Sequence, residues 1–207
     1  LDFFGAKKQE QKLIAIPNPA SFKTQNKSIV TKKENRIIYV GRLSNTQKRV
    51  DRLLEIWKQI HESNPDWKFD VLGDGDQKEA MQDYCKKHSL DRICFHGFQD
   101  PKPFLKEARV FTMTSDYEGF PMVLLEAQSY GVVPLAFNCF SSINDIILYK
   151  KTGVVIKDFD VSSYVKNLEG LISDPAYLDQ LAINGIDHAK LFEKSKIAEQ
   201  WITHFGS

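Results

Sequence analysis

Short apolar runs alternate with amphipathic stretches from Arg36 onward, and this alternation restricts the fold more than any other feature of the chain. The apolar runs predict buried strands, which lie at 37–40, 69–72, 93–96, 110–114, 133–137 and 153–156. Helical spacing occurs between them at 50–61, 77–88, 102–108 and 121–130, and a mostly helical tail covers 161–205. Strands joined by helical crossovers predict an α/β fold, a Rossmann-like doubly wound parallel sheet of about six strands with a helical C-terminal tail.

The segment before the first predicted strand shows little periodicity. A polar run at 7–12 is followed by an extended apolar segment at 13–19 that ends in two prolines. We therefore predict a linker at 1–35 that leads into a domain at 36–190, and a last helix at 191–207. Because the chain does not begin with Met, we expect that residue 1 is not the natural start of the gene product.

The charge balance and the cysteines exclude several classes of protein. The 28 basic and 27 acidic side chains nearly cancel, so the chain lacks the positive field that non-specific nucleic-acid binding needs. No apolar run approaches the roughly 20 residues of a membrane-spanning helix, and the first residues lack the order of a signal peptide. Cys85, Cys94 and Cys139 form no Cys-x-x-Cys pair, which predicts small buried side chains in a reducing, cytoplasmic compartment.

The turn between the fourth predicted strand and the next helix has the character of an anion site. Pro121 suits the first position of a helix, and Gly119 permits unusual backbone angles before it. The first N–H groups of that helix, those of Met122, Val123 and Leu124, would then face the crevice beyond the strand ends and could hold a phosphate. Glu118 could orient a sugar and Glu126 could bind a vicinal diol, whereas the plainer alternative is a capped helix with two solvated glutamates.

The loop after the first predicted strand brings two cations to the same end of the sheet. Arg42 and Lys48 bracket this loop, and both could point at one anion, Arg42 through a planar fork and Lys48 as a compact charge. Together with a helix start they could neutralise a diphosphate leaving group without a metal ion. The alternative is that both are solvated surface charges.

Two further strand-end turns could meet a nucleoside. Gly73 and Asp74 follow the second predicted strand, where glycine would let a nucleotide approach the backbone. Asp74-x-Asp76 is either a metal-binding pair or a pair of turn formers. Phe98 and Gln99 follow the third predicted strand and could contact a base, although Phe98 could equally be a core aromatic. A Gly-x-x-x-x-Gly-Lys-Ser/Thr phosphate loop and a Gly-x-Gly-x-x-Gly fingerprint are both missing.

In this order, the turns resemble the carboxy-terminal, donor-binding domain of the retaining GT-B glycosyltransferases of the family four group. The resemblance covers 13–156 and rests on motifs that the chain carries in register. They are Ile-Pro-Asn-Pro at 16–19, Gly-Arg-Leu with Lys48 six residues after the Arg, Gly-Asp-Gly at 73–75, His-Gly-Phe at 96–98 and Glu-Gly-Phe-Pro-x-Val-Leu-Leu-Glu at 118–126. Tyr-Glu-Gly-Phe-Pro followed by Ser-Tyr-Gly-Val-Val-Pro is most similar to enzymes that build bacterial surface polysaccharide or lipopolysaccharide.

The resemblance implies a role for each site residue. Arg42 and Lys48 would hold the donor diphosphate, and Glu126 would bind the ribose hydroxyls. Glu118 and the backbone of Gly119, Phe120 and Pro121 would meet the transferred sugar, while the nucleoside would be lined by Gly73, Asp74, Phe98 and Gln99. No metal and no cofactor is expected. The chain departs from the family's pattern at Arg49, where many relatives have Gly, and at 142–144, where many have Gly-Pro.

The resemblance also implies what the chain does. It would serve an enzyme that transfers a sugar, with retention, from a nucleotide-diphosphate sugar to a sugar or lipid-linked acceptor. That acceptor would be bound mainly by an amino-terminal domain that this chain does not contain, so we expect the chain alone to bind nucleotide but to be nearly inactive, with the tail at 191–205 crossing back toward the missing domain. Lysine pairs such as Lys32-Lys33 would favour a peripheral place on the cytoplasmic membrane face, although paired lysines are usually solvated.

Three alternatives remain open at this point. The first is a nucleotide-sugar epimerase or a phosphorylase-like protein on the same architecture. The second is a non-catalytic sugar-nucleotide-binding module that kept the fold. The third is a metal-dependent transferase that uses Asp74 and Asp76.

Overall fold

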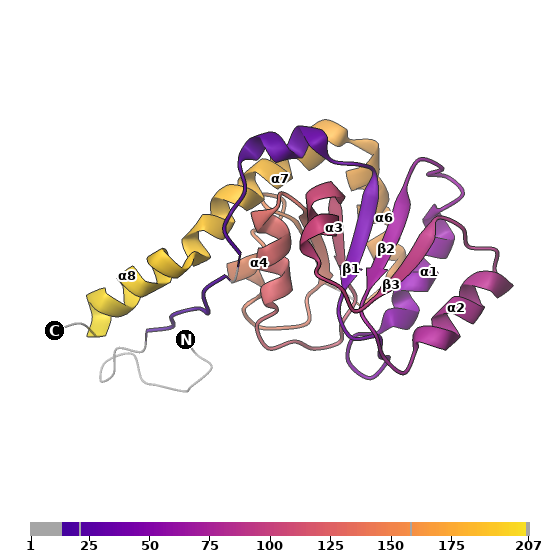
Figure 1. Cartoon of the computed structure of the whole chain (residues 1–207), viewed down its shortest axis with the longest axis horizontal. Helices are drawn as coiled ribbons and strands as arrows, with labels where there is room; N and C mark the ends of the chain where they lie inside the picture. The colour runs from indigo at the N-terminus through magenta and orange to yellow at the C-terminus, as the bar shows by residue number, and fades with distance from the viewer. Residues whose placement is uncertain (1–13, 21, 158, 206–207) are drawn as a thin grey trace.

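The computed structural model describes residues 14–20, 22–157 and 159–205. Its centre is a parallel sheet of six strands, which confirms the predicted α/β, Rossmann-like fold (Figure 1). All six predicted strands are present. They are β1 (Arg36–Val40), β2 (Lys68–Leu72), β3 (Ile93–Gly97), β4 (Val110–Met113), β5 (Val133–Phe137) and β6 (Val154–Ile156).

The strand order is β3-β2-β1-β4-β5-β6, so the chain first winds outward from β1 and then returns to the other side of it. The order therefore reverses between β1 and β4, which pair through Ile37–Val110 and Ile38–Phe111. In sheets of this kind, ligands bind beyond the carboxyl ends of the strands at such a reversal point. The turns after β1 and β4 are thus neighbours in space although they lie about 70 residues apart in sequence.

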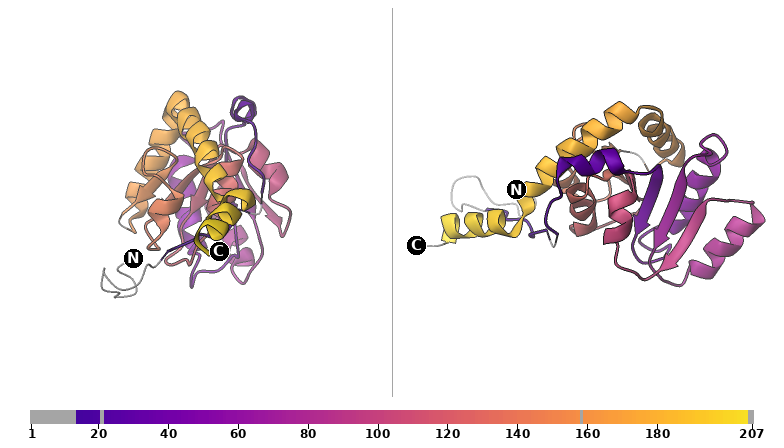
Figure 2. Two further views of the ribbon diagram at one scale, coloured as in Figure 1. Left: turned by 90° about the vertical axis from the view of Figure 1, so that its left-hand side faces the viewer. Right: turned by 45° about the horizontal axis from the view of Figure 1, so that its top comes forward.

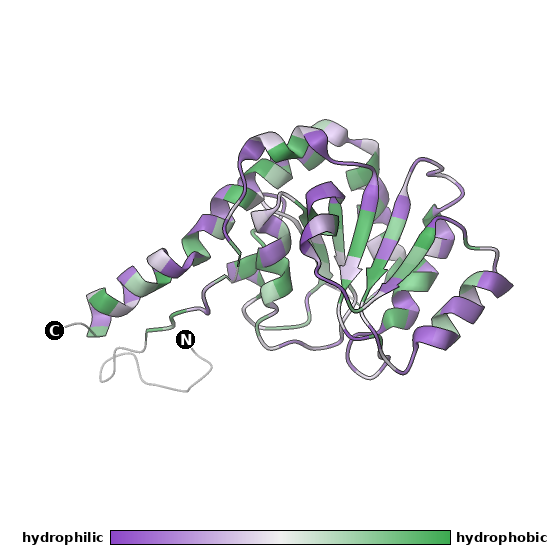
Figure 3. Ribbon diagram, in the orientation of Figure 1, coloured by the Kyte–Doolittle hydropathy of each residue, from purple (hydrophilic) through white to green (hydrophobic). Residues whose placement is uncertain are grey.

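Helices cover both faces of the sheet. One face packs against α1 (Val50–Ile60), α2 (Lys78–Lys87) and α6 (Val161–Ser173), and the other packs against α3 (Lys102–Glu107), α4 (Met122–Ser129) and α5 (Ile143–Ile146). Successive strand residues point to opposite faces, as Ile37 and Ile38 do, so the inner strands carry apolar residues on both sides and form the hydrophobic centre in Figure 3.

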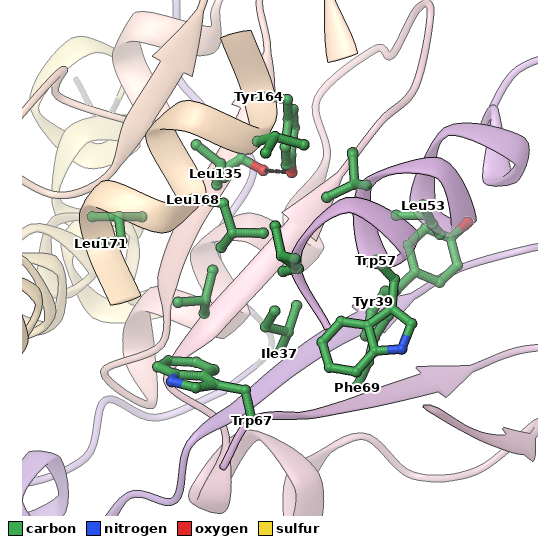
Figure 4. Packing of buried hydrophobic residues seen from close by; sticks show 14 of the residues in the cluster. Ile37, Tyr39, Leu53, Trp57, Trp67, Phe69, Leu135, Tyr164, Leu168 and Leu171 are labelled. Carbon is green, nitrogen blue, oxygen red and sulfur yellow. Dashed lines mark hydrogen bonds between the residues drawn. The ribbon is translucent and has the colours of Figure 1, made fainter. Parts of the chain in front are cut away.

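The core on the α1 side is rich in aromatic rings (Figure 4). Trp57 of α1 packs against Phe69 of β2 with their ring centroids 5.8 Å apart. Tyr164 of α6 is fully buried, and its hydroxyl donates to the carbonyl oxygen of Leu135 at 2.6 Å and accepts the backbone N–H of Met113 at 3.2 Å. A buried hydroxyl that meets both neighbours in this way satisfies its hydrogen-bonding capacity while it holds α6 against β4 and β5.

The tail is helical, as predicted, but it is divided. Asp174 ends α6 and caps α7 (Pro175–Ala189) by accepting the backbone N–H of Tyr177 at 2.9 Å, with Pro175 at the first helical position. A 3₁₀ turn, η3 (Lys190–Phe192), then leads to α8 (Lys194–Phe205). Figure 2 shows α8 projecting from the body of the molecule, where Trp201, Ile202 and Phe205 are exposed.

Part of the predicted linker packs against the domain. Its 3₁₀ helix, η2 (Lys27–Lys32), buries Val30, and the backbone N–H of Ala20 donates to the carbonyl of Phe192 at 2.7 Å. The segment at 14–20 therefore runs beside the start of the last helix (Figure 1). The polar run at 7–12, and residues 206–207 of the predicted last helix, lie outside the described residues.

Candidate functional site

Backbone hydrogen bonds join the turns that follow β1, β2 and β3. The N–H of Gly41 donates to Leu72 O at 3.0 Å, the N–H of Leu43 to Asp74 O at 2.9 Å, and the N–H of Gly73 to Gly97 O at 2.7 Å. A β-carbon on Gly73, where φ is +136°, would lie 1.9 Å from Gly41 O. The glycine that we predicted to admit a nucleotide is therefore required first for the close approach of two neighbouring turns.

These three turns enclose a cavity of about 350 Å³. The cavity gathers five predicted site residues, Arg42, Gly73, Asp74, Phe98 and Gln99, next to the ends of β1 and β2 and to Pro101. Phe98 is 92% exposed, so the alternative that it is a core aromatic is wrong. The volume falls in the range of small-molecule sites, and the exposed ring offers an aromatic face at the mouth.

A second part of the site joins the loops that follow β1 and β4. Lys48 Nζ lies 2.6 Å from Glu118 Oε1, and the Glu118 side chain is only 9% exposed. The hydroxyl of Ser115 donates to the same oxygen at 2.7 Å, and Gln47 Nε2 donates to the carbonyl of Tyr117 at 3.2 Å. Lys48 and Glu118 are thus partners in a partly buried contact, which does not agree with the alternative of solvated charges for these two residues, whereas Arg42 is exposed.

Tyr39 contacts the loop that lines the cavity and lies within range of the charge of Glu118. Its hydroxyl donates to Arg42 O at 2.9 Å. Burial and the nearby charge of Glu118 raise the pKa of Tyr39 above its usual value. The same two causes raise the pKa of Cys139 to about 12. The charge of Glu118 therefore acts on both the phenol of Tyr39 and the thiol of Cys139. Our sequence analysis singled out neither Tyr39 nor Cys139 for the site, because neither stands in one of the turn motifs.

Asp116 fixes the loop that carries Glu118. Its carboxylate accepts from Arg49 at 3.2 Å and from Arg52 at 2.6 Å. Arg52 also donates to Thr114 O at 3.1 Å, and the Thr114 hydroxyl donates to Lys48 O at 3.0 Å. Burial alone would raise the pKa of Asp116, but the hydrogen bonds from Arg52 and Arg49 outweigh it and hold the pKa below its usual range.

The start of α4 corrects three details of the prediction. Pro121 is the N-cap with ψ at 91°, and the first helical residue is Met122. The N–H of Leu124 is not free, because it donates to Pro121 O at 3.1 Å, so the N–H groups of Met122 and Val123 alone remain as candidates among those predicted. Gly119 has no positive φ and is exposed, so it does not supply the unusual backbone angle that we expected.

Phe120 precedes this helix, and Glu126 lies within it. Phe120 is half-buried, and its ring centroid lies 6.4 Å from that of Phe192 in the tail. Glu126 is half-buried on α4. Burial first, and then the charges of Asp100 and Glu126, raise the pKa of Tyr130. Glu126 does not line the cavity itself.

Asp74 is engaged as a turn residue. Its carboxylate accepts the N–H of Gly75 at 2.8 Å and pairs with Lys78 Nζ at 2.9 Å. The hydrogen bonds from Lys78 and then from Gly75 lower the pKa of Asp74.

The burial of the cysteines differs from the prediction, because only Cys85 is buried, whereas Cys94 is exposed and Cys139 is half-buried.

Known proteins match this chain in sequence and in fold. A family model described as glycosyl transferases group 1 matches residues 21–188. The chain is 31% identical over 175 residues to the amylovoran biosynthesis glycosyltransferase AmsD of Erwinia amylovora, which covers 84% of the chain and 48% of that protein. The chain spans about half the length of the curated relatives it matches, namely 54% and 48% of two of them.

Solved structures agree with this match. The apo form of the lipopolysaccharide outer core galactosyltransferase WaaB has a TM-score of 0.74 and 25% identity, over 93% of this chain and 55% of that one. The pneumococcal O-GlcNAc transferase GtfA, in complex with UDP and GlcNAc, has a TM-score of 0.80 over 98% of this chain and 41% of that one. At 19% identity the second likeness shows the fold alone. In the part of the chain that the structure describes, no helix has the length and apolar character to cross a bilayer.

Proposed function

The chain belongs to the glycosyl transferases of group 1, and from this premise we propose that it is the donor-binding half of such an enzyme. It binds a nucleotide-diphosphate sugar at the carboxyl ends of β1 to β4. The observation that carries the proposal is the contact between Lys48 and Glu118, which joins the cation-bearing loop after β1 to the acidic loop after β4 at the reversal point of the sheet.

The diphosphate is the natural partner of the two cations. Arg42 lines the cavity, and Lys48 belongs to the same loop after β1 and pairs with Glu118. When the bond between the anomeric carbon and the β-phosphate oxygen breaks, negative charge accumulates on the diphosphate. Cations and amide dipoles that face that oxygen stabilise the charge most where it is greatest, which lowers the barrier, by on the order of 3 kcal/mol for each preorganised donor.

The rest of the donor is assigned to the neighbouring side chains. The cavity lined by Gly73, Asp74, Phe98 and Gln99 holds the nucleoside, and the carboxylate of Glu126 accepts two ribose hydroxyls. Glu118 and the backbone at 119–121 face the transferred sugar. The neighbour GtfA was solved with UDP and GlcNAc, so UDP is the first nucleotide to test.

The same proposal includes the reaction of the whole enzyme. Transfer proceeds with retention and without a metal ion or cofactor, and the acceptor is bound mainly by a second domain. The 207-residue chain alone then binds donor and transfers little or no sugar. Relatives in bacterial lipopolysaccharide and polysaccharide synthesis suggest the same kind of product here. A cytoplasmic location, with a peripheral place at the membrane face, stays a prediction.

Titration of the chain with UDP, GDP, ADP and CMP, with and without a chelator, tests the proposal. We expect one nucleoside diphosphate to bind and to do so equally well in the chelator. Lys48→Ala should weaken binding of that nucleotide and of inorganic diphosphate alike, by about tenfold, because a charge-assisted contact is lost. Glu126→Ala should weaken the nucleotide more than inorganic diphosphate. Glu169→Ala, at an exposed position on α6, is the matched control.

Two outcomes would contradict the proposal. Unchanged affinity of the Lys48 and Glu126 variants would remove the site assignment. An absolute need for a divalent ion would favour the metal-dependent alternative that uses Asp74 and Asp76.

A further inference from the structure

A second cluster of polar side chains lies on β2 and β3, before the strands end. Asp70 of β2 is directly opposite Cys94 of β3 in the register, and His96 follows Cys94 by two residues, so all three side chains share one face of the sheet. Asp70 Oδ, Cys94 Sγ and a ring nitrogen of His96 all lie within 4.8 Å of one another. The ring of His96 packs against Phe104 of α3, with centroids 4.5 Å apart, which identifies this face as the one that α3 covers.

The cluster already holds its carboxylate in a fixed orientation. Asp70 is buried, with its side chain 3% exposed, and Oδ1 lies 2.7 Å from His96 Nε2. Arg36 donates to the other oxygen, Oδ2, at 3.0 Å. His96 and Arg36 thus hold one carboxylate oxygen each, and Cys94 Sγ lies within 4.8 Å of both the carboxylate and the imidazole nitrogen.

The surrounding charge favours a cation. Arg36 is the positive partner of Asp70, but it also contacts Glu34 at 2.8 Å and Glu107 at 3.6 Å. Three carboxylates therefore surround one guanidinium, so the negative charges outnumber the positive charge even without a contribution from the thiol. A Cys94 thiolate would add a further negative charge at the exposed edge of the sheet, where an ion can enter from solvent.

We propose that Asp70 Oδ1, Cys94 Sγ and His96 Nε2 bind a divalent transition-metal ion of the zinc class, with water as the fourth ligand. One oxygen, one sulfur and one nitrogen ligand form a set that suits zinc and its neighbours and does not suit magnesium or calcium, which take oxygen ligands. Binding releases the thiol proton, and the imidazole proton shared by Nε2 and Asp70 moves to Nδ1 or to solvent, so that two metal bonds replace the Asp70–His96 hydrogen bond.

The exposed thiol is what distinguishes this cluster from an ordinary ion-pair network. Arg36 and His96 each form a hydrogen bond with Asp70, and neither bond needs Cys94. A network that only stabilised the fold would therefore not require a thiol at this position. An ion at this place would link the edge strand β3 to β2. It would also lie under the turn that carries Phe98 and Gln99, because Gln99 Nε2 donates to the carbonyl of His96 at 3.0 Å.

Zinc and cobalt titrations of the whole chain test the site without any nucleotide or sugar. We expect one zinc ion per chain in competition with a chromophoric chelator, and a thiolate-to-cobalt charge-transfer band with Co²⁺. Cys94→Ser should lower the zinc affinity by about 100-fold or more and abolish the band. Loss of a residue that only hydrogen-bonds to a metal ligand already costs about 10- to 100-fold, and loss of the ligand itself should cost at least as much. Cys94 is exposed, so this variant keeps the Arg36–Asp70–His96 network and should fold.

Two variants serve as matched controls, Cys139→Ala for removal of another thiol and His88→Gln for removal of another imidazole. Both should retain the zinc affinity and the cobalt band. Absence of stoichiometric zinc binding, a cobalt spectrum without the thiolate band, or full affinity in Cys94→Ser would overturn the site. None of these readouts depends on donor binding, so this inference and the proposed function fail independently.

Discussion

Gly73 and Gly75 lie in the turn after β2, where the absence of a β-carbon lets this turn approach the turn after β1. A β-carbon would lie 1.9 Å from Gly41 O at Gly73 and 2.2 Å from Leu43 O at Gly75. Gly73 also has a φ of +136°, which other residues rarely adopt. At the residue scale, the turns after β1 and β2 can touch only because both positions lack a side chain.

Gly73→Ala is therefore expected to lower the free energy of unfolding by about 2 to 4 kcal/mol, because the backbone is strained and the turns must separate. Urea unfolding measures this change. Gly170→Ala is the control, since its β-carbon would meet open space on α6, and it should raise stability by up to about 1 kcal/mol through helix propensity. A Gly73→Ala protein as stable as the parent would mean that the two turns do not approach so closely.

At the scale of elements, the molecule depends on how the start of α1 is held against the loop after β4. Arg49 and Arg52 both reach across to Asp116, and the N–H of Asp116 donates to Gln47 O at 2.9 Å. Arg49 has a φ of 50°, in the left-handed region that favours glycine. Its ion pair with Asp116 gives a reason for an arginine there.

Asp116→Asn is expected to weaken nucleoside diphosphate binding about fivefold, equivalent to about 1 kcal/mol of lost preorganisation. The variant should also lose stability in a pH-dependent way. The pKa of Asp116 is lowered in the folded state, so its contribution is present above the ordinary value of 3.8 and is lost as the pH falls below it.

The difference in stability between parent and Asp116→Asn should accordingly be largest near neutral pH and should shrink in acid. Nucleotide titration and urea unfolding across pH measure the two effects. Asp83→Asn, which removes an exposed pair with Lys86, should change neither. A stability difference that does not vary with pH would contradict the role given to the Asp116 carboxylate.

For the molecule as a whole, thiol and phenol groups that are shielded from water make the stability depend on pH in alkaline solution. Burial raises the pKa of Cys85 to about 11. Burial, followed by the charge of Glu118, raises that of Cys139 to about 12. Burial also raises the pKa of Tyr39 and of Tyr164. These groups lie in different parts of the core, so their protons are released together only when the fold opens.

The contribution of these two thiols to the free energy of unfolding should therefore be constant below about pH 9, the ordinary thiol value, and should fall as the pH rises toward 12. The sign follows because the unfolded chain loses thiol protons that the folded chain keeps. Urea unfolding at several alkaline pH values measures the slope. A double variant, Cys85→Ala with Cys139→Ala, should show a shallower slope, and an identical slope would show that these thiols are not protected by the fold.

The amino-acid pattern was sufficient to predict the six strands, the parallel fold and the turns that carry the candidate site. Strands such as 37–40 and 133–137 are buried on both faces, so their apolar runs are local signals. The helix η2 was missed because it is a 3₁₀ helix in a segment with little periodicity, and α5 was missed because four residues are too few to show a helical period. Roles assigned by resemblance, such as those of Glu126 and Gln99, stay predictions.

Which side chains meet was decided by the tertiary structure alone. Lys48 meets Glu118, and Asp70 meets Cys94, only because β1 pairs with β4 and β2 pairs with β3. Local propensity acts over a few residues, whereas these contacts join segments up to 70 residues apart, and strand order is set by the packing of the whole core. The sequence therefore determines which functional groups each turn carries, whereas the side chains that contact those groups and change their charge and orientation are brought to them only by folding.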